Sequence, residues 1–294
     1  MHLIRHFEHE CKKISRHKRC MEFYIGEFGY THFNVSYLKN MISLMVYSMY
    51  KGYIPVINVN HDNQESIQWE WYFEQPSNII AMGDISEYKR EKSNICIGDY
   101  KPTFMDIFNL GNEDFLVWSF LFQKLIIFNN KTNEYIQHEM NLIQKGKTLG
   151  LLLRGTDYIT LKPKGHPIQP KTEEVLRVAE EWMHKKGYKY IYVATEEKRL
   201  LNMVIEYFGE QKVLTNNRSY YDEKYYKGNP CVISSIKLYD ENDNYKRGLE
   251  YLSSLVILGN CDGLISGNSG GVQFALYYSK TYKDIYVFNK GFYH

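Results

Sequence analysis

From residue 148 to the C-terminus the sequence alternates between short apolar runs and helical patterns, an order that few folds accommodate. The apolar runs, which predict strands, lie at 149–153, 190–194, 213–214, 263–266 and 284–288. The helical patterns between them end at Gly187 and Gly209 or cover 249–258 and 269–279. Such alternation predicts an α/β fold with a parallel sheet whose strands all point their carboxyl ends to one edge. Ligands of open α/β sheets bind along that edge.

The first half of the chain is less regular. Apolar residues at steps of three and four predict a helix over 36–50, and a strand over 53–59 follows a stop at Gly52. A further helical pattern ends at Gly146. We therefore expect a domain boundary near Lys147, with an N-terminal domain over 1–147 and a C-terminal domain over 148–294.

Aromatic and apolar stretches mark the first half. The segment 69–76 is expected to pack its rings under a loop or to line a cleft, and the 27 tyrosines of the chain suit both uses. Residues 77–111 show weak periodicity and predict irregular structure. Residues 115–128 are strongly apolar but too short to cross a membrane, so they predict a buried helix.

The composition narrows the class of protein. With 36 Lys and Arg against 34 Asp and Glu the net charge is +2, so the chain has no general basic field and we expect no nucleic-acid partner. Five cysteines without a CxxC pair predict no disulfide framework and favour a reducing cytoplasm. The N-terminus lacks the apolar core of a signal peptide, and no run of about 18 apolar residues occurs. We expect a cytoplasmic protein without a transmembrane segment; association with a membrane surface stays an open alternative.

One candidate metal cluster lies near the N-terminus. It comprises His6, His9, Cys11, His17 and Cys20. No pair of these residues has zinc-finger spacing, so we expect no bound metal there and a polar, partly frayed terminus instead.

Three polar segments follow predicted strands of the second half, at residues 154–157, 195–197 and 266–271. The last has three glycines and opens a helix, whose N–H groups and dipole favour an anion. A phosphate would therefore fit near Asn268, Ser269 and Gly270, although a tight turn without a ligand gives the same pattern. The segment matches neither the phosphate loop with Lys-Ser/Thr nor the dinucleotide fingerprint.

Arg154 ends the first of these strands. Rigid backbone would hold its planar guanidinium, which can bind a phosphate through two parallel hydrogen bonds. A salt bridge to Asp157 or Glu196 is the alternative. With an anion site on one loop and a fixed guanidinium on another, the simplest interpretation is a diphosphate that bridges them, since both can stabilise the charge of a leaving diphosphate.

These residues resemble the fucosyltransferase superfamily of core α1,6-, nodulation and protein O-fucosyltransferases. The resemblance rests on Leu151-Leu-Leu-Arg-Gly-Thr-Asp157 with His166-Pro167 beyond it, on Val193-Ala-Thr-Glu-Glu197, and on Cys261-Asp-Gly-Leu-Ile-Ser-Gly-Asn-Ser269. In the first half, 52–56 and 69–76 resemble segments of bacterial surface-polysaccharide glycosyltransferases. The resemblance implies the GT-B fold, two Rossmann-like domains facing a cleft, with a GDP-sugar in the C-terminal domain and acceptor contacts mainly from the N-terminal domain.

The resemblance also implies roles for single residues. Arg154 would contact the β-phosphate of GDP-fucose, with Thr156 and Asp157 ordering its loop. The nucleotide would lie near Thr195 and Glu196 and its phosphates at Ser269 and Gly270, whereas Glu250 would serve the ribose or the base. Arg154, Asp157 and His166 are the candidate catalytic residues. His166 is a candidate base by its chemistry, although His-Pro before a helix also serves to shape a loop.

Two departures from the family pattern stand out. The leading histidine of the family, which contacts the nucleotide, is Leu152 here, and no carboxylate lies between Tyr158 and Gly165, where some members place a base. We expect an inverting, metal-independent fucosyltransferase without a cofactor, which transfers a sugar from a GDP donor to a glycan or lipid-linked glycan of bacterial surface polysaccharide. A different nucleotide-sugar donor and a non-catalytic nucleotide- or sugar-binding module are the alternatives.

Overall fold

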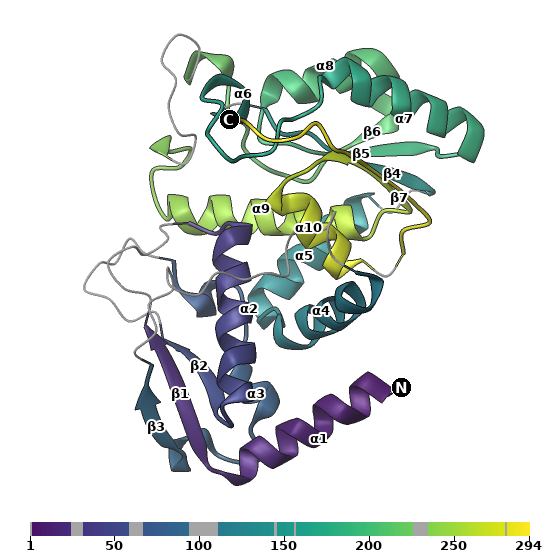
Figure 1. The fold of residues 1–294 in the computed structure, drawn as a ribbon. Coiled ribbons are helices and arrows are strands. Elements are labelled where there is room, and N and C mark those ends of the chain that lie inside the picture. Colours follow the sequence, from purple (N-terminus) through teal and green to yellow (C-terminus); the bar gives the residue numbers. More distant parts are fainter. Residues whose placement is uncertain are drawn as a thin grey trace. The chain divides into compact units, whose positions relative to one another are not determined.

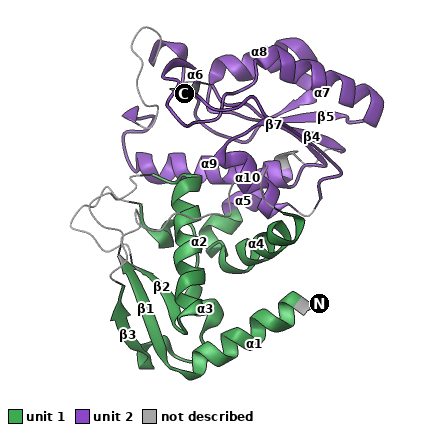
Figure 2. Cartoon of the chain, viewed as in Figure 1, with its two compact units in different colours: residues 1–134 green, residues 135–294 purple. Residues whose placement is uncertain are grey.

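A computed structural model describes residues 2–24, 32–58, 67–93, 111–143, 146–155, 157–225, 235–279 and 281–294 (Figure 1). The chain forms two compact units, residues 1–134 and 135–294 (Figure 2). The division falls inside helix α5 (Asn130–Ile143), upstream of the boundary that we expected near Lys147. From Tyr135 onward α5 belongs to the second unit, where its buried Glu139 accepts a hydrogen bond from the backbone N–H of Asn217 at 2.6 Å.

The first unit contains a small parallel sheet with the strand order β2-β1-β3. Its strands are β1 (Arg19–Tyr24), β2 (Ile54–Asn58) and β3 (Lys89–Lys92), and its helices are α1 (His2–Arg16), α2 (Val35–Tyr50), α3 (Pro76–Ile80), α4 (Asn112–Leu125) and the start of α5. The predicted helix over 36–50 and the strand after it are confirmed as α2 and β2. Asn34 caps α2 by accepting from the N–H of Tyr37, and Gly52 turns the chain with a φ of 80°.

Three elements of this unit differ from the sequence-based expectations. The terminus that we expected to be partly frayed is helix α1, and β1 was not predicted. The part of 77–111 that the structure describes contains β3 in addition to irregular backbone, and 94–110 lies outside the described residues. The apolar segment 115–128 does form helix α4, but this helix is only partly buried, since Leu116 is 61% exposed.

The aromatic segment 69–76 packs inside the first unit. Trp69, Tyr72 and Phe73 are at most 1% exposed, and the ring centroids of Trp69 and Phe73 lie 4.6 Å apart. The indole N–H of Trp69 donates to the backbone oxygen of Glu74 at 2.8 Å, so its polar atom is satisfied. Of the two uses expected for these rings, packing is the one that is confirmed.

The second unit is built on a five-stranded parallel sheet with the order β6-β5-β4-β7-β8. Its strands are β4 (Thr148–Leu152), β5 (Tyr190–Ala194), β6 (Val213–Leu214), β7 (Gly263–Gly267) and β8 (Asp284–Phe288). Its helices after α5 are α6 (Asp157–Thr160), α7 (Thr172–Lys186), α8 (Lys198–Phe208), α9 (Asp243–Gly259) and α10 (Gly270–Tyr278). All five strands and the four long helices predicted from residue 148 onward are confirmed.

Helices cover both faces of this sheet (Figure 1). Leu149, Leu151 and Leu153 point to the face covered by α7 and α8, where they join one buried apolar cluster. Leu152 points to the other face, where a Cβ atom on Gly271 of α10 would come within 3.1 Å of it. Because residues on both faces of β4 are buried, the strand is apolar throughout, which is why the sequence predicts it so clearly.

The strand order places a topological switch point at the centre of the sheet. From β4 the chain proceeds outward through β5 and β6, and then returns to place β7 and β8 on the opposite side of β4. Doubly wound sheets bind ligands at the carboxyl ends of the strands where the order reverses. In this unit that point lies between β4 and β7.

Candidate functional site

Three polar residues stand in a row at the carboxyl ends of the central strands. Leu152 of β4 pairs in register with Ala194 of β5 and with Ser266 of β7. The chain therefore leaves these three neighbouring strands at nearly the same level of the sheet, and polar residues follow two positions further on. These residues are Glu196, Arg154 and Asn268, so the segments that the sequence analysis singled out come together at the switch point.

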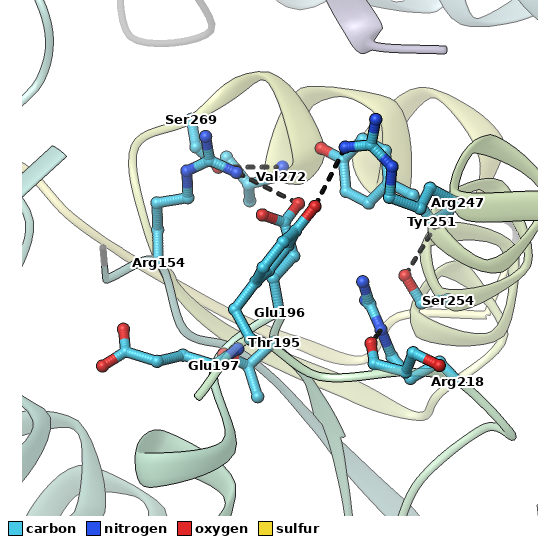
Figure 3. Close-up of polar contacts among 12 residues, drawn as sticks. Arg154, Thr195, Glu196, Glu197, Arg218, Arg247, Tyr251, Ser254, Ser269 and Val272 are labelled. Atoms are coloured by element: carbon cyan, nitrogen blue, oxygen red, sulfur yellow. Dashed lines mark hydrogen bonds and ion pairs between the residues drawn. The ribbon is translucent and has the colours of Figure 1, made fainter. Parts of the chain in front are cut away.

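Arg154 is largely buried and paired. Its side chain is 25% exposed, and Nη1 lies 3.3 Å from Oε1 of Glu196, whose side chain is 19% exposed (Figure 3). The salt bridge weighed as an alternative for Arg154 therefore exists with Glu196. The side chain of Asp157 lies outside the described residues, as does Thr156, so their expected roles stay predictions.

The turn between β7 and α10 is held by several contacts. Ser269 is the N-cap of α10, and its hydroxyl accepts from the N–H of Val272 at 3.4 Å (Figure 3). Gln169 donates through Nε2 to the backbone oxygen of Asn268 at 2.7 Å. A Cβ atom on Gly267 would lie 2.3 Å from Oε1 of Gln169, so only glycine allows this close approach. The turn thus presents the free N–H groups of the helix start at a fixed place.

The segment after β5 is also fixed by hydrogen bonds. Thr195 is 3% exposed, and its hydroxyl accepts from the N–H of Glu197 at 3.3 Å. The backbone oxygen of Glu196 accepts from the N–H of Tyr221 at 2.8 Å. The carboxylate of Glu197 pairs with Nε of Arg199 at 3.0 Å. The side chain of Thr195 thus supports the turn, while that of Glu196 faces Arg154.

A second arginine site near this edge was not predicted. Arg247 of α9 donates to Oδ2 of Asp243 at 2.8 Å and to the hydroxyl of Tyr221 at 2.9 Å. The pKa of Tyr221 is raised to about 12 by burial, against the lowering influence of Arg247. Asp243 and Arg247 have the i, i+4 spacing of a helical ion pair, which was the signal available in the sequence. Figure 3 shows Arg247 and Arg154 with Glu196 between them.

Glu250 is committed to a cluster of side chains behind the strand ends. Its carboxylate accepts from the hydroxyl of Tyr239 and, at 3.3 Å, from the backbone N–H of Ser219. Burial raises the pKa of Glu250 above its usual value, and the neighbouring Glu139 raises it further. The contacts show Glu250 holding the loop after β6; its expected role toward a ribose or base stays a prediction.

We predict that a Glu250→Gln variant gains stability relative to the wild type as the pH rises. Because the pKa of Glu250 is raised in the folded protein, the native state holds a proton that the unfolded chain releases, and this contribution is lost as the pH rises through the folded pKa. Urea unfolding of both proteins between pH 4 and 7 measures the difference. A constant difference across this range would contradict the assignment.

His166 lies in the loop before α7. Its side chain is exposed, its N–H donates to the backbone oxygen of Pro163 at 3.0 Å, and its own backbone oxygen accepts from Tyr293 at 3.0 Å. Pro167 forms a bridge with Phe292. The His-Pro pair therefore ties the loop before α7 to the C-terminal segment, which is the loop-shaping use; a use as base stays a prediction.

Two negative findings concern the described residues alone. They contain no group of three or more His, Cys, Asp or Glu side chains able to hold a metal ion, so the N-terminal histidines and cysteines form no such cluster. Within the same ranges, every helix is too short or too polar to cross a membrane.

No protein-family model and no curated sequence matches the chain. Solved structures do resemble it. One is POFUT1 in complex with GDP-fucose, with a TM-score of 0.51 and 10% identity over 92% of this chain and 98% of that one. A second is the fucosyltransferase NodZ from Bradyrhizobium, with a TM-score of 0.50 and 12% identity over 87% of this chain and 92% of that one. A third is a mutant of Arabidopsis thaliana FUT1 in complex with GDP, with a TM-score of 0.51 and 8% identity over 96% of this chain and 78% of that one.

These similarities define the fold. The chain is an α/β protein with parallel sheets, and its fold is that of the fucosyltransferases named above. At identities of 8–12% the similarity extends to the fold alone.

Proposed function

We propose that the protein is a glycosyltransferase that transfers fucose from GDP-fucose to a glycan acceptor. The observation that supports this most is the row at the switch point, where Arg154 and the start of α10 stand at neighbouring strand ends. Proteins of the same fold are named for fucosyl transfer and were solved with GDP or GDP-fucose. A diphosphate is the ligand that a buried guanidinium beside helix N–H groups suits best.

In the proposed reaction, a hydroxyl oxygen of the acceptor attacks the anomeric carbon of fucose. The bond between that carbon and the β-phosphate oxygen breaks, and GDP leaves with the electron pair. Arg154 and the N–H groups of α10 would stabilise the charge that develops on GDP, with no cofactor required. The hydroxyl proton passes to a base, for which His166 is the candidate. Attack from the side opposite the leaving group makes the transfer inverting.

The acceptor is proposed to be a glycan or lipid-linked glycan of bacterial surface polysaccharide, bound mainly by the N-terminal domain that the sequence predicts over 1–147. The reaction would take place in the cytoplasm, either in solution or at a membrane surface. The first-half segments that resemble polysaccharide glycosyltransferases support this part of the proposal.

Calorimetry with GDP and turnover of GDP-fucose test the proposal. We expect the wild type to bind GDP and to release it from GDP-fucose faster when a glycan acceptor extract is present. Absence of GDP binding would defeat the proposed site, and binding without acceptor-dependent turnover would defeat the proposed activity.

Two observations favour alternative functions. Leu152 fills the position of the family histidine that contacts the nucleotide, and it packs against α10. This favours a donor whose nucleotide differs from GDP. The stretch from Tyr158 to Gly165 has no carboxylate, which would suit a binding module without catalysis. A panel of nucleotide-sugar donors, scored by release of the nucleotide, separates the first alternative, and turnover with any donor excludes the second.

We predict that Glu196→Gln raises the affinity for GDP about two- to fivefold. The carboxylate of Glu196 pairs with Arg154 and places a negative charge beside the proposed diphosphate, and neutralising a partly exposed pair changes the free energy by about 0.2–1 kcal/mol. Calorimetry at low and at high salt measures the gain, which screening should reduce. Weaker binding by the variant would instead indicate that Glu196 itself contacts the nucleotide.

A further inference from the structure

Asn268 lies in the turn between β7 and α10, directly after a strand that pairs with β4. The pairing of Leu152 with Ser266 brings Arg154 and Asn268, two residues beyond each, to the same level of neighbouring strands. Asn268 directly precedes Ser269, the N-cap of α10, so it stands at the helix start that the proposed ligand site uses.

The carboxamide of Asn268 is buried with an unsatisfied acceptor. The residue is 7% exposed, and within the described part of the chain its Oδ1 has no hydrogen-bond partner. Its backbone oxygen is already held by Gln169, and the neighbouring Ser269 hydroxyl already accepts from Val272. A buried polar atom without a partner costs free energy, so its retention at a fixed turn indicates a ligand group that satisfies it.

The kind of group follows from the chemistry of an amide oxygen. Oδ1 accepts hydrogen bonds, and the oxygens of a phosphate that is ionised at neutral pH have no hydrogen to give. Arg154 and the start of α10 are the groups suited to phosphate. A hydroxyl supplies the missing hydrogen, and a nucleotide sugar carries hydroxyls on its ribose and on its sugar.

We propose that the carboxamide of Asn268 accepts a hydrogen bond from a hydroxyl of the bound nucleotide sugar, and so distinguishes the glycosyl or ribosyl part of the donor from its phosphates. This inference rests on the proposed function. The group that Asn268 recognises is a hydroxyl that donates a hydrogen bond. Such a hydroxyl can belong to the ribose or to the transferred sugar, and the experiment below distinguishes the two.

The test compares Asn268→Ala with the wild type by calorimetry against four probes: pyrophosphate, 2′,3′-dideoxy-GDP, GDP and GDP-fucose. We expect the variant to bind pyrophosphate and dideoxy-GDP as the wild type does. Loss of one hydrogen bond should weaken binding of the hydroxyl-bearing ligand roughly three- to tenfold. A loss that begins with GDP assigns the ribose, and a loss seen with GDP-fucose alone assigns the sugar.

Three outcomes overturn the inference. Equal weakening of pyrophosphate would mean that the amide nitrogen donates to a phosphate, and weakening of dideoxy-GDP but not of pyrophosphate would mean that an N–H of guanine is the donor. Unchanged binding of all four probes would mean that Asn268 makes no ligand contact. If the wild type binds none of the nucleotides, the proposed function itself is wrong. This result differs from those that contradict only the role of Asn268. Asn202→Ala, which removes an exposed asparagine from α8, is the matched control, and thermal unfolding of both variants verifies that the turn stays folded.

Discussion

Replacing Arg154 with alanine is expected to weaken GDP binding by a factor of at least about one hundred. A guanidinium that binds a phosphate through two hydrogen bonds loses both, and each hydrogen bond to a charged group contributes about 1.5–3 kcal/mol. The largely buried position of Arg154 limits screening by solvent, and the variant also leaves the carboxylate of Glu196 facing the diphosphate without its partner. Calorimetry with GDP measures the change, and GDP release from GDP-fucose should fall at least as much.

Two further variants sharpen this result. Arg154→Lys keeps the charge but not the planar fork, so we expect it to bind more tightly than the alanine variant and more weakly than the wild type. Arg177→Ala removes an exposed arginine from within α7, outside the proposed site, and should leave GDP binding unchanged. If Arg154→Ala binds GDP as the wild type does, the assignment of the diphosphate site is wrong.

Replacing Gly155 with valine is expected to lower the free energy of unfolding by about 1–3 kcal/mol. A Cβ atom at this position would lie 2.0 Å from Oε2 of Glu197 and 2.9 Å from Cδ1 of Leu200. Glu197 is 1% exposed and paired with Arg199, so its carboxylate has little room to move, and Leu200 is part of the buried cluster under α8. Urea unfolding measures the loss.

Gly83→Ala is the control for this prediction. A Cβ atom on Gly83 would meet nothing within 4 Å, so the same kind of change should be nearly neutral there. Gly155→Ala should fall between the two, because it adds the clash with the carboxylate but not the branches of valine. Equal unfolding free energies for Gly155→Val and the wild type would show that the loop after β4 moves to accommodate the side chain. The prediction that this loop is rigid would then be wrong.

The second half of the fold was predictable because burial dictates its sequence. Each central strand is covered on both faces by helices, so runs such as 149–153 are apolar at every position, and glycines such as Gly187 and Gly209 end the helices between them. Three-dimensional context was not needed to recognise these elements.

The small sheet of the first unit gave much weaker signals. β3 has the sequence Lys-Arg-Glu-Lys and is mostly exposed, so no alternation of apolar and polar residues marks it. Arg90 of this strand pairs with Glu22 of β1 at 2.9 Å, and such a contact between residues far apart in sequence cannot be read from either segment alone. Helix α1 was also difficult to predict, because few of its side chains are apolar and buried.

The candidate site divides in a similar way. Residues directly at strand ends, such as Arg154, Glu196 and Asn268, could be predicted because parallel strands bring their carboxyl ends together. The partners that hold them could not: Tyr221 meets Arg247, and Glu250 meets Tyr239 and Ser219, only through the folding of the loop after β6. The division between the two compact units falls inside α5, where the helical pattern continues without a break and so gives no signal in the sequence.

That helix also limits how the chain can be dissected or recombined. A C-terminal half that begins at Thr148 would lack Glu139, and the N–H of Asn217 in the loop after β6 would lose its buried acceptor. A half-protein or a chimaera with another chain of this fold should therefore be joined before Asn130, the first residue of α5. Exchange at this point would transfer the whole five-stranded sheet together with the helix whose Glu139 holds Asn217.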